Sequence, residues 1–197
     1  MGDGRPLRAD ARRNRDRLLQ TAKSAFAEEG LSVPLDEIAR RAGVGPGTLY
    51  RHFPTKEALF EAVVHERLRQ LLNEARSLHE AADAGAALFG FVERLVAEAA
   101  AKQDLVDALA GAGVEVRTTV AATSADLRDE IGGLLVRAQT SGAVREDVGI
   151  ADLMALLSGL LLALRAPSNN AADPERALTV LRDGLRARPE VVPTQPG

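Results

Sequence analysis

Residues 35–60 read LDEIARRAGVGPGTLYRHFPTKEALF, a pattern that predicts two short helices, a turn between them and the start of a third helix. Gly43 ends the first of these helices and turns the chain. Gly45 followed by Pro46 marks the start of the second, because glycine is an acceptable N-cap and proline is favoured in the first turn. Leu49 and Phe53 lie four residues apart and therefore point to the same inward side.

The outward side of this second helix carries four residues that can hydrogen-bond or stack, and no acid: Thr48, Tyr50, Arg51 and His52. A helix of this kind can enter a major groove without repelling the phosphates, so the stretch predicts DNA binding. Arg51 could pair with a guanine through two hydrogen bonds or neutralise a phosphate, and both interpretations stay open. Thr48 could equally be a structural hydroxyl, and His52 a buried histidine.

The charge is divided unevenly along the chain. Residues 1–56 carry eleven Lys and Arg against seven Asp and Glu, a charge of +4, whereas the remainder carries −7 and the total is −3. A basic head on an acidic body is expected of a protein that contacts phosphates through one end only. Arg12 and Arg13 belong to this head and could reach the DNA backbone or minor groove, or remain a solvated basic tail.

Composition and the motifs that are missing argue against several other classes of protein. The chain has no cysteine, which excludes disulfides and thiolate sites. No G-x-S-x-G, Walker loop or H-E-x-x-H occurs, and His65 and His79 have neither metal-ligand spacing nor an obvious acidic partner, so we expect no enzyme, no metal and no cofactor. The N-terminus lacks the apolar core of a signal peptide and no apolar run is long enough to span a membrane, so we expect a cytoplasmic protein.

Helical periodicity continues through the rest of the chain and predicts an all-α fold. A long helix should run from residue 58 to about residue 78. Further helices are expected at residues 84–101, 104–110, 116–141, 150–166 and 174–186. Gly132 and Gly133 fall inside one of them, where each glycine costs about 1 kcal/mol. A kink, room beside a ligand or close packing would each account for the pair.

Residues 14–63 closely resemble the DNA-binding domain of TetR-family transcriptional regulators. The likeness rests on LLQTAKSAFAEEG, DEIARRAGVG and above all GTLYRHFPTKEALF. Beyond it the chain is similar to that family only in being an all-helical C-terminal domain of the right length. The motif implies that Thr48, Tyr50 and His52 contact DNA and that Lys56 lies on a phosphate.

The resemblance implies a homodimeric regulator, usually a repressor, that leaves a palindromic operator when a small molecule enters its C-terminal domain. Residues 1–10 are polar and rich in Gly, Pro and Arg, so we predict a flexible arm there, followed by a helix-turn-helix DNA-binding domain over 11–55. A helical effector-binding and dimerisation domain should cover 56–188, and a disordered tail 189–197. The predicted DNA-binding residues are Pro46, Gly47, Thr48, Tyr50, Arg51, His52, Lys56, Arg12 and Arg13.

Three positions depart from the family pattern. Val33 stands where a Ser or Thr commonly caps the second helix, and Gly45 where a Ser is common. The second helix opens with Pro34, Leu35 and Asp36 in place of polar residues that suit a phosphate. We therefore expect fewer side-chain phosphate contacts from this helix.

The effector pocket and the dimer interface are predicted from apolar residues of the C-terminal half. Pocket candidates are Phe89, Val92, Leu95, Leu109, Leu127, Ile131 and Leu135, for each of which ordinary core packing is the alternative. The segment LMALLSGLLLALRA is too apolar for a monomer surface, which favours burial against a second subunit. The predicted interface residues are Leu153, Leu156, Leu157, Leu160, Leu161, Leu164, Leu178 and Leu181.

Two other functions remain as alternatives. The chain could be a DNA-binding regulator without a small-molecule ligand, controlled by a protein partner or by its abundance, and a filled C-terminal core would favour this. A helical enzyme with an incidental helix-turn-helix would need a cluster of carboxylates or histidines with shifted pKa values in a cleft.

Overall fold

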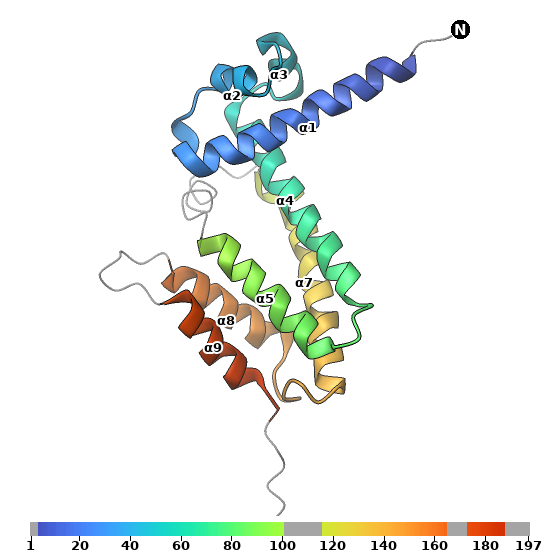
Figure 1. Cartoon of the computed structure of the whole chain (residues 1–197), viewed down its shortest axis with the longest axis vertical. Coiled ribbons are helices and arrows are strands. Elements are labelled where there is room, and N and C mark those ends of the chain that lie inside the picture. Colours follow the sequence, from blue (N-terminus) through green and yellow to red (C-terminus); the bar gives the residue numbers. More distant parts are fainter. Residues whose placement is uncertain (1–3, 101–115, 165–172, 188–197) are drawn as a thin grey trace, which may run out of the picture. The chain divides into compact units, whose positions relative to one another are not determined.

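The computed structural model describes residues 4–100, 116–164 and 173–187, and these residues form helices and no strand. One isolated bridge joins Val144 to Arg186. The all-α prediction is confirmed. The elements, labelled as in Figure 1, are α1 (Gly4–Glu29), η1 (Gly30–Ser32), α2 (Leu35–Arg41), α3 (Pro46–His52), α4 (Lys56–Leu78), α5 (Ala84–Ala100), α7 (Val116–Thr140), α8 (Ile150–Ala163) and α9 (Pro174–Leu185).

The described residues divide into two compact units. Unit 1 comprises residues up to 71 together with 116–125, and unit 2 comprises 72–100 with 126–164 and 173–187. The division falls inside α4, whereas the predicted functional domains divide at the start of that helix. The predicted functional limits stay a prediction.

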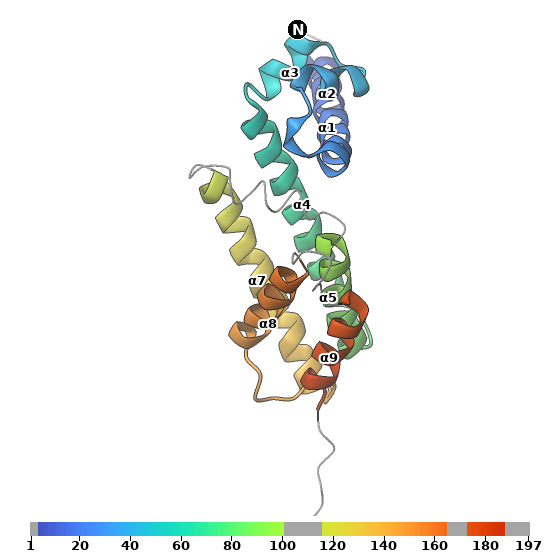
Figure 2. The ribbon, with the colours of Figure 1, turned by 90° about the vertical axis from the view of Figure 1, so that its left-hand side faces the viewer.

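Unit 1 is built on a core to which α1, α2, α3 and the first half of α4 all contribute (Figures 1 and 2). The Phe26 and Phe60 rings meet edge to face, with centroids 5.6 Å apart. Ile38 of α2 and Leu49 of α3 are fully buried in the same cluster, as their helical spacing predicts. The short helices α2 and α3 therefore share one core with α1 and the first half of α4.

The turns around α2 and α3 follow the local sequence. Gly43 has a φ of +63°, a left-handed conformation that favours glycine. Gly45 is extended and precedes Pro46 at the first helical position, as predicted. The N-cap of α2 is Pro34 rather than Val33, the position that the family pattern suggested. Pro34 is extended and precedes the first helical residue, Leu35, whereas Val33 is buried.

The start of α1 corrects the predicted arm. The helix begins at Gly4, whereas a flexible segment was expected up to residue 10. Pro6 falls in the first turn, where the N–H that it lacks has no intrahelical partner to lose. The next residues up to Arg17 contain no glycine or proline, and side-chain pairs such as Arg13 with Asp10 support the turn.

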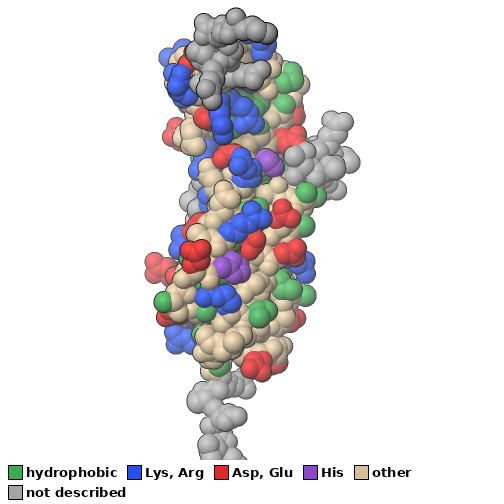
Figure 3. All heavy atoms as spheres, turned by 90° about the vertical axis from the view of Figure 1, so that its right-hand side faces the viewer, with side chains coloured by type: hydrophobic (Ala, Val, Ile, Leu, Met, Phe, Trp, Pro, Cys, Tyr) green, Lys and Arg blue, Asp and Glu red, His purple; other side chains and the backbone are tan. Residues whose placement is uncertain are grey.

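In unit 2, α5 packs against α8 and α9 (Figure 1). The limits of α5, α7, α8 and α9 differ from the predicted ones by at most three residues. The helix predicted at 104–110 and the tail at 189–197 lie outside the described residues. On the face shown in Figure 3, acidic and basic side chains are interspersed over the surface of this unit.

The C-terminal end of α4 is fastened to α7 by polar contacts. The Arg137 guanidinium donates to the carbonyls of Leu78, the last residue of α4, and of Ala81 just beyond it, at 3.0 and 2.8 Å. His79 Nε2 lies 3.0 Å from Glu130 Oε2. The expectation that His79 has no acidic partner was wrong, because helix packing brings Glu130 to it from 51 residues further along the chain.

The position of His79 also decides between the three interpretations of the glycine pair, which were a kink, room beside a ligand and close packing. A Cβ on Gly133 would lie 2.6 Å from His79 Cε1, whereas a Cβ on Gly132 would meet only Ile150, at 3.7 Å. Close packing therefore accounts for Gly133, and nothing in the described residues requires glycine at 132.

Replacing the two glycines should have different effects on the free energy of unfolding. Gly132→Ala should raise the free energy of unfolding by up to about 1 kcal/mol, the helix-propensity gain of alanine. Gly133→Ala should give little or none of this gain, because the His79 ring must leave Glu130 to make room for the methyl group. Chemical denaturation of the two variants checks this, and equal stabilities would contradict the packing.

Candidate nucleic-acid interface

Helix α3 presents its polar residues outward because two apolar residues hold its other side in the core. Leu49 is fully buried and Phe53 nearly so, whereas Tyr50 and Arg51 are exposed. Thr48 and His52 are half-buried, and Pro46 and Gly47 are exposed at the start of the helix. All six predicted DNA-binding residues of α3 therefore have side chains or backbone that are at least partly accessible.

Arg51 is held by one hydrogen bond through Nε, and its two terminal nitrogens remain available. Its Nε donates to the Gly47 carbonyl, at 3.1 Å, one turn back along the helix. The two terminal nitrogens make no hydrogen bond within the described part of the chain. A guanidinium held in this way is preordered for a bidentate acceptor such as the O6 and N7 edge of guanine.

Tyr50 has a partner that the sequence did not reveal. Its hydroxyl donates to Asp36 Oδ1, at 3.1 Å, across the turn between α2 and α3. The hydrogen bond to Asp36 raises the pKa of Tyr50, with smaller contributions from burial and from the negative charge. From the sequence, Asp36 was interpreted only as a residue that weakens phosphate contact. Its acidic side chain was the one feature of the sequence that could have indicated a hydrogen bond with Tyr50.

Lys56 joins the start of α4 to η1 by a hydrogen bond. Its Nζ donates to the Leu31 carbonyl in η1, at 2.9 Å, and the side chain is half-buried. This structural contact was not foreseen. It leaves two ammonium protons for other acceptors, so the predicted phosphate contact of Lys56 stays a prediction.

The arginines of α1 differ in their surroundings. The Arg15 guanidinium lies 5.6 Å from the centroid of the Phe53 ring, a cation–π contact that links α1 to the end of α3. Arg12 is exposed, with no ion pair in the described residues. Arg13 pairs with Asp10, which offsets its charge. Of the two predicted contact residues, Arg12 is the better placed for a phosphate.

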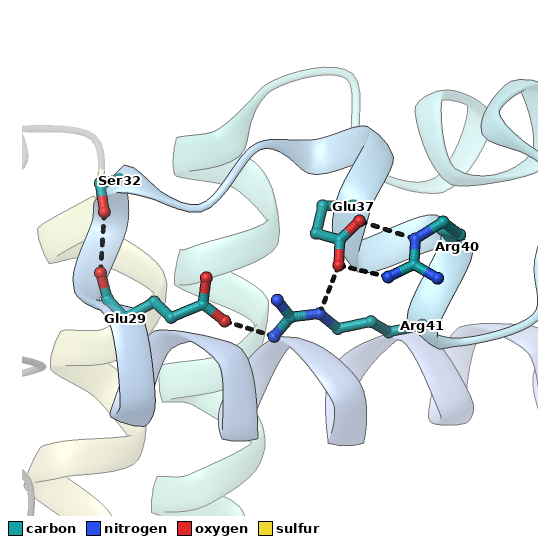
Figure 4. A network of polar contacts seen from close by, with 5 residues as sticks. All are labelled: Glu29, Ser32, Glu37, Arg40 and Arg41. Atoms are coloured by element: carbon teal, nitrogen blue, oxygen red, sulfur yellow. Dashed lines mark hydrogen bonds and ion pairs between the residues drawn. The ribbon is translucent and has the colours of Figure 1, made fainter.

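The arginines of α2 are held by carboxylates (Figure 4). Glu37 accepts from Arg40 Nη2 at 2.7 Å and from Arg41 Nε at 2.8 Å, and Arg41 also pairs with Glu29 of α1. These hydrogen bonds lower the pKa of Glu37 from 4.5 to about 2 and raise the pKa of Arg41. The network joins α1 to α2 and offsets much of the positive charge of α2.

The predicted effector-pocket residues within the described ranges differ in their surroundings. Four of them are buried among core residues of unit 2: Val92, Leu127, Ile131 and Leu135. Leu95 is half-buried and Leu109 lies outside the described residues. Phe89 instead lines an open hollow of about 620 Å³ between α5, the α7–α8 turn and the end of α9, beside the Glu93–Arg182 ion pair.

The predicted dimer residues need a correction. Leu153, Leu157 and Leu164 are buried in the core of the single chain, so they are not free to contact a second subunit. Periodicity alone could not tell a helix face that packs within the chain from one that packs on a partner. Four others are half-buried: Leu160, Leu161, Leu178 and Leu181. Leu156 is exposed, as are two apolar residues that the sequence analysis did not select, Leu162 and Val180, at 67% and 66%.

The described residues contain neither a cluster of metal-ligating side chains nor a membrane-spanning helix. No group of three or more His, Asp or Glu lies together as metal ligands there. Within the same residues no helix combines the length and the apolar character needed to cross a membrane.

Both halves of the chain match known families. Residues 18–63 match the family described as bacterial regulatory proteins, tetR family, and residues 83–187 match the C-terminal domain described as transcriptional regulator SbtR-like. The chain is also similar to an HTH-type transcriptional regulator of Staphylococcus aureus strain USA300, with 41% identity over 63 residues. That match covers 32% of this chain and 34% of the relative, about a third of its length.

Two solved structures match over nearly the whole chain. One is a TetR transcription regulatory protein from Mycobacterium vanbaalenii, with 47% identity and a TM-score of 0.75 over 92% of this chain and 100% of that one. The other is the TetR transcriptional regulator SCO0520 from Streptomyces coelicolor, with 34% identity and a TM-score of 0.71 over 89% and 99%.

The Glu37 network should make stability depend on acid. A carboxyl whose pKa is lowered by folding stabilises the folded form above its unfolded pKa, and this contribution is lost as the pH falls from about 4.5 toward 2. Glu37→Gln should therefore melt below the wild type at pH 7, and the gap should narrow between about pH 5 and pH 3. The exposed Glu28→Gln serves as the control, and a gap for Glu37→Gln that stays constant across this range would contradict the network.

Proposed function

Because the chain belongs to the TetR family of bacterial transcriptional regulators, we propose that it is a homodimeric repressor released from a palindromic operator by a small-molecule effector. Regulators of this family bind DNA and act as dimers. The observation that carries the proposal for this chain is α3, a short helix with its apolar side in the core and Tyr50 and Arg51 exposed. Its place of action is the cytoplasm, where the operator lies.

Sequence reading is assigned to α3 and positioning to its surroundings. Arg51 reads a guanine, while exposed cations such as Arg12 contact phosphates and set the register on the duplex. Arg40 and Arg41 contribute less to phosphate binding, since Glu37 and Glu29 already hold them. This division agrees with the expectation of fewer side-chain phosphate contacts from α2.

Dimerisation is assigned to the exposed faces of α8 and α9. Leu162 lies opposite the buried Leu153 and Leu157 on α8, and its neighbours Ala155, Ser158 and Gly159 are small and exposed. Small residues let two helices approach closely. A dimer of this kind would place two α3 helices on half-sites about 34–36 Å apart, or a further turn apart for a longer operator.

Effector control is assigned to unit 2. An effector shifts the equilibrium only by its differential affinity for the DNA-bound and released forms, for which about 1–3 kcal/mol of coupling is typical. The hollow of about 620 Å³ beside Phe89 lies within the size range of small-ligand sites. The filled surroundings of Val92, Ile131 and Leu135 favour the second candidate function, a regulator controlled by a protein partner or by abundance.

Replacing Arg51 tests base reading. Arg51→Ala should weaken operator binding by about 1–3 kcal/mol and relax the preference at one base pair in each half-site. Selection from a random library followed by anisotropy titration measures both. Arg128→Ala, which removes an exposed charge from α7, is the control. An unchanged base preference would show that Arg51 does not read the sequence.

Replacing Leu162 tests the dimer face. Leu162→Asp should convert the dimer into a folded monomer, because it places a charge in the proposed interface while leaving the core of the chain intact. Val136→Asp, at a similarly exposed apolar position on α7, should remain dimeric. Light scattering after size exclusion gives the mass and circular dichroism the fold. A dimeric Leu162→Asp variant would place the interface elsewhere.

A further inference from the structure

An acidic side chain lies beside the helix proposed to enter the major groove. Asp36 is exposed in the first turn of α2, and one of its oxygens accepts the hydroxyl proton of Tyr50 of α3. A carboxylate on a DNA-facing surface is repelled by phosphates, and it lowers affinity unless it finds a donor there. The position of Asp36 therefore needs a reason.

Helix stability supplies only part of that reason. An acid in the first turn is favoured by the helix dipole, and both Asp36 and Glu37 occupy this turn. Glu37 turns back along α2 to Arg40 and Arg41, which accounts for it within the fold. Asp36 makes no ion pair in the part of the chain described and turns instead toward Tyr50. The helix dipole explains the charge of Asp36 but not its direction.

The hydrogen bond between Tyr50 and Asp36 leaves this pair of side chains with hydrogen-bond acceptors and no donor. Asp36 Oδ1 accepts from Tyr50, so Oδ2 retains its lone pairs for a second donor. The Tyr50 hydroxyl has given its one proton to Asp36 and can only accept in turn. An outward-facing acceptor cannot bind a phosphate, but it matches an exocyclic amino group. The major groove offers two amino donors, N4 of cytosine and N6 of adenine. The N7 acceptor beside adenine N6 repels a carboxylate, so N4 of cytosine is the better match for Asp36.

We propose that Asp36 reads a cytosine in each half-site by accepting a hydrogen bond from its N4 amino group, with Tyr50 as the residue that positions the carboxylate. The inference rests on the proposed DNA-binding function and adds a reader from α2 to that of α3. It also reassigns the Tyr50 hydroxyl, which serves Asp36 rather than a phosphate. The cost of the negative charge is then offset at operators with cytosine and not at other sequences.

The test is operator selection with three forms of the full-length protein. Asp36→Asn keeps the shape and the acceptor for Tyr50 but turns the outward group from an acceptor into a donor. The preference for cytosine at one position of each half-site should fall by about tenfold, with a base that presents an acceptor taking its place. Tyr50→Phe removes only the hydroxyl that orients Asp36 and should weaken the same preference without affecting other positions.

The control and the opposing outcomes are distinct. Glu28→Gln removes one exposed acidic charge from the same unit and should leave the base preference unchanged. If Asp36→Asn strengthens binding to all sequences alike and keeps the selected motif, Asp36 only repels DNA and the inference is overturned. If the wild type selects no motif at all, the proposed function itself fails, which separates the two failures.

Discussion

The burial of Leu49 and Phe53 is the constraint on which the reading surface depends. A helix of seven residues is not stable alone, so α3 exists only because these two side chains enter the core formed with Ile38, Phe26 and Phe60. Once they are buried, the helical repeat places Tyr50 and Arg51 on the opposite side. The exposure of Tyr50 and Arg51 is thus a consequence of packing, and it requires α1, α2 and α4 at once.

The charges of unit 1 are divided between holding the fold and meeting a partner. Arg41 joins Glu29 and Glu37, Lys56 holds the Leu31 carbonyl, and Arg15 covers the Phe53 ring. These contacts orient the helices, and they also reduce the number of cations available to phosphates. A count of basic residues therefore overstates the electrostatic attraction of this head for DNA. Direction and partner matter more than the net charge of +4.

Several predictions from sequence agree with the structure because they rest on local rules. Helix limits follow from periodicity and from caps such as Thr55, whose hydroxyl accepts the N–H of Ala58. The apolar helix at 150–163 was also located correctly, but some of its leucines were assigned to a dimer interface although they are buried within the chain. Leu153 and Leu157 are as apolar as interface residues would be, and only the packing of α5 on α8 reveals that they belong to the chain's own core.

Residue patterns alone sufficed for the helical class, for the turn at Gly43 and for the family, since each depends on neighbours within a few positions. Tertiary structure decided which polar groups are partners, because those pairs are remote in the chain. Asp36 meets Tyr50 14 residues away, Lys56 meets Leu31 25 away, and Arg137 meets Leu78 59 away. Hydrogen bonds form only near 3 Å, and no local rule brings residues so far apart to that distance. Packing of the helices does so, and with it selects which side chains hold the fold and which remain to read DNA.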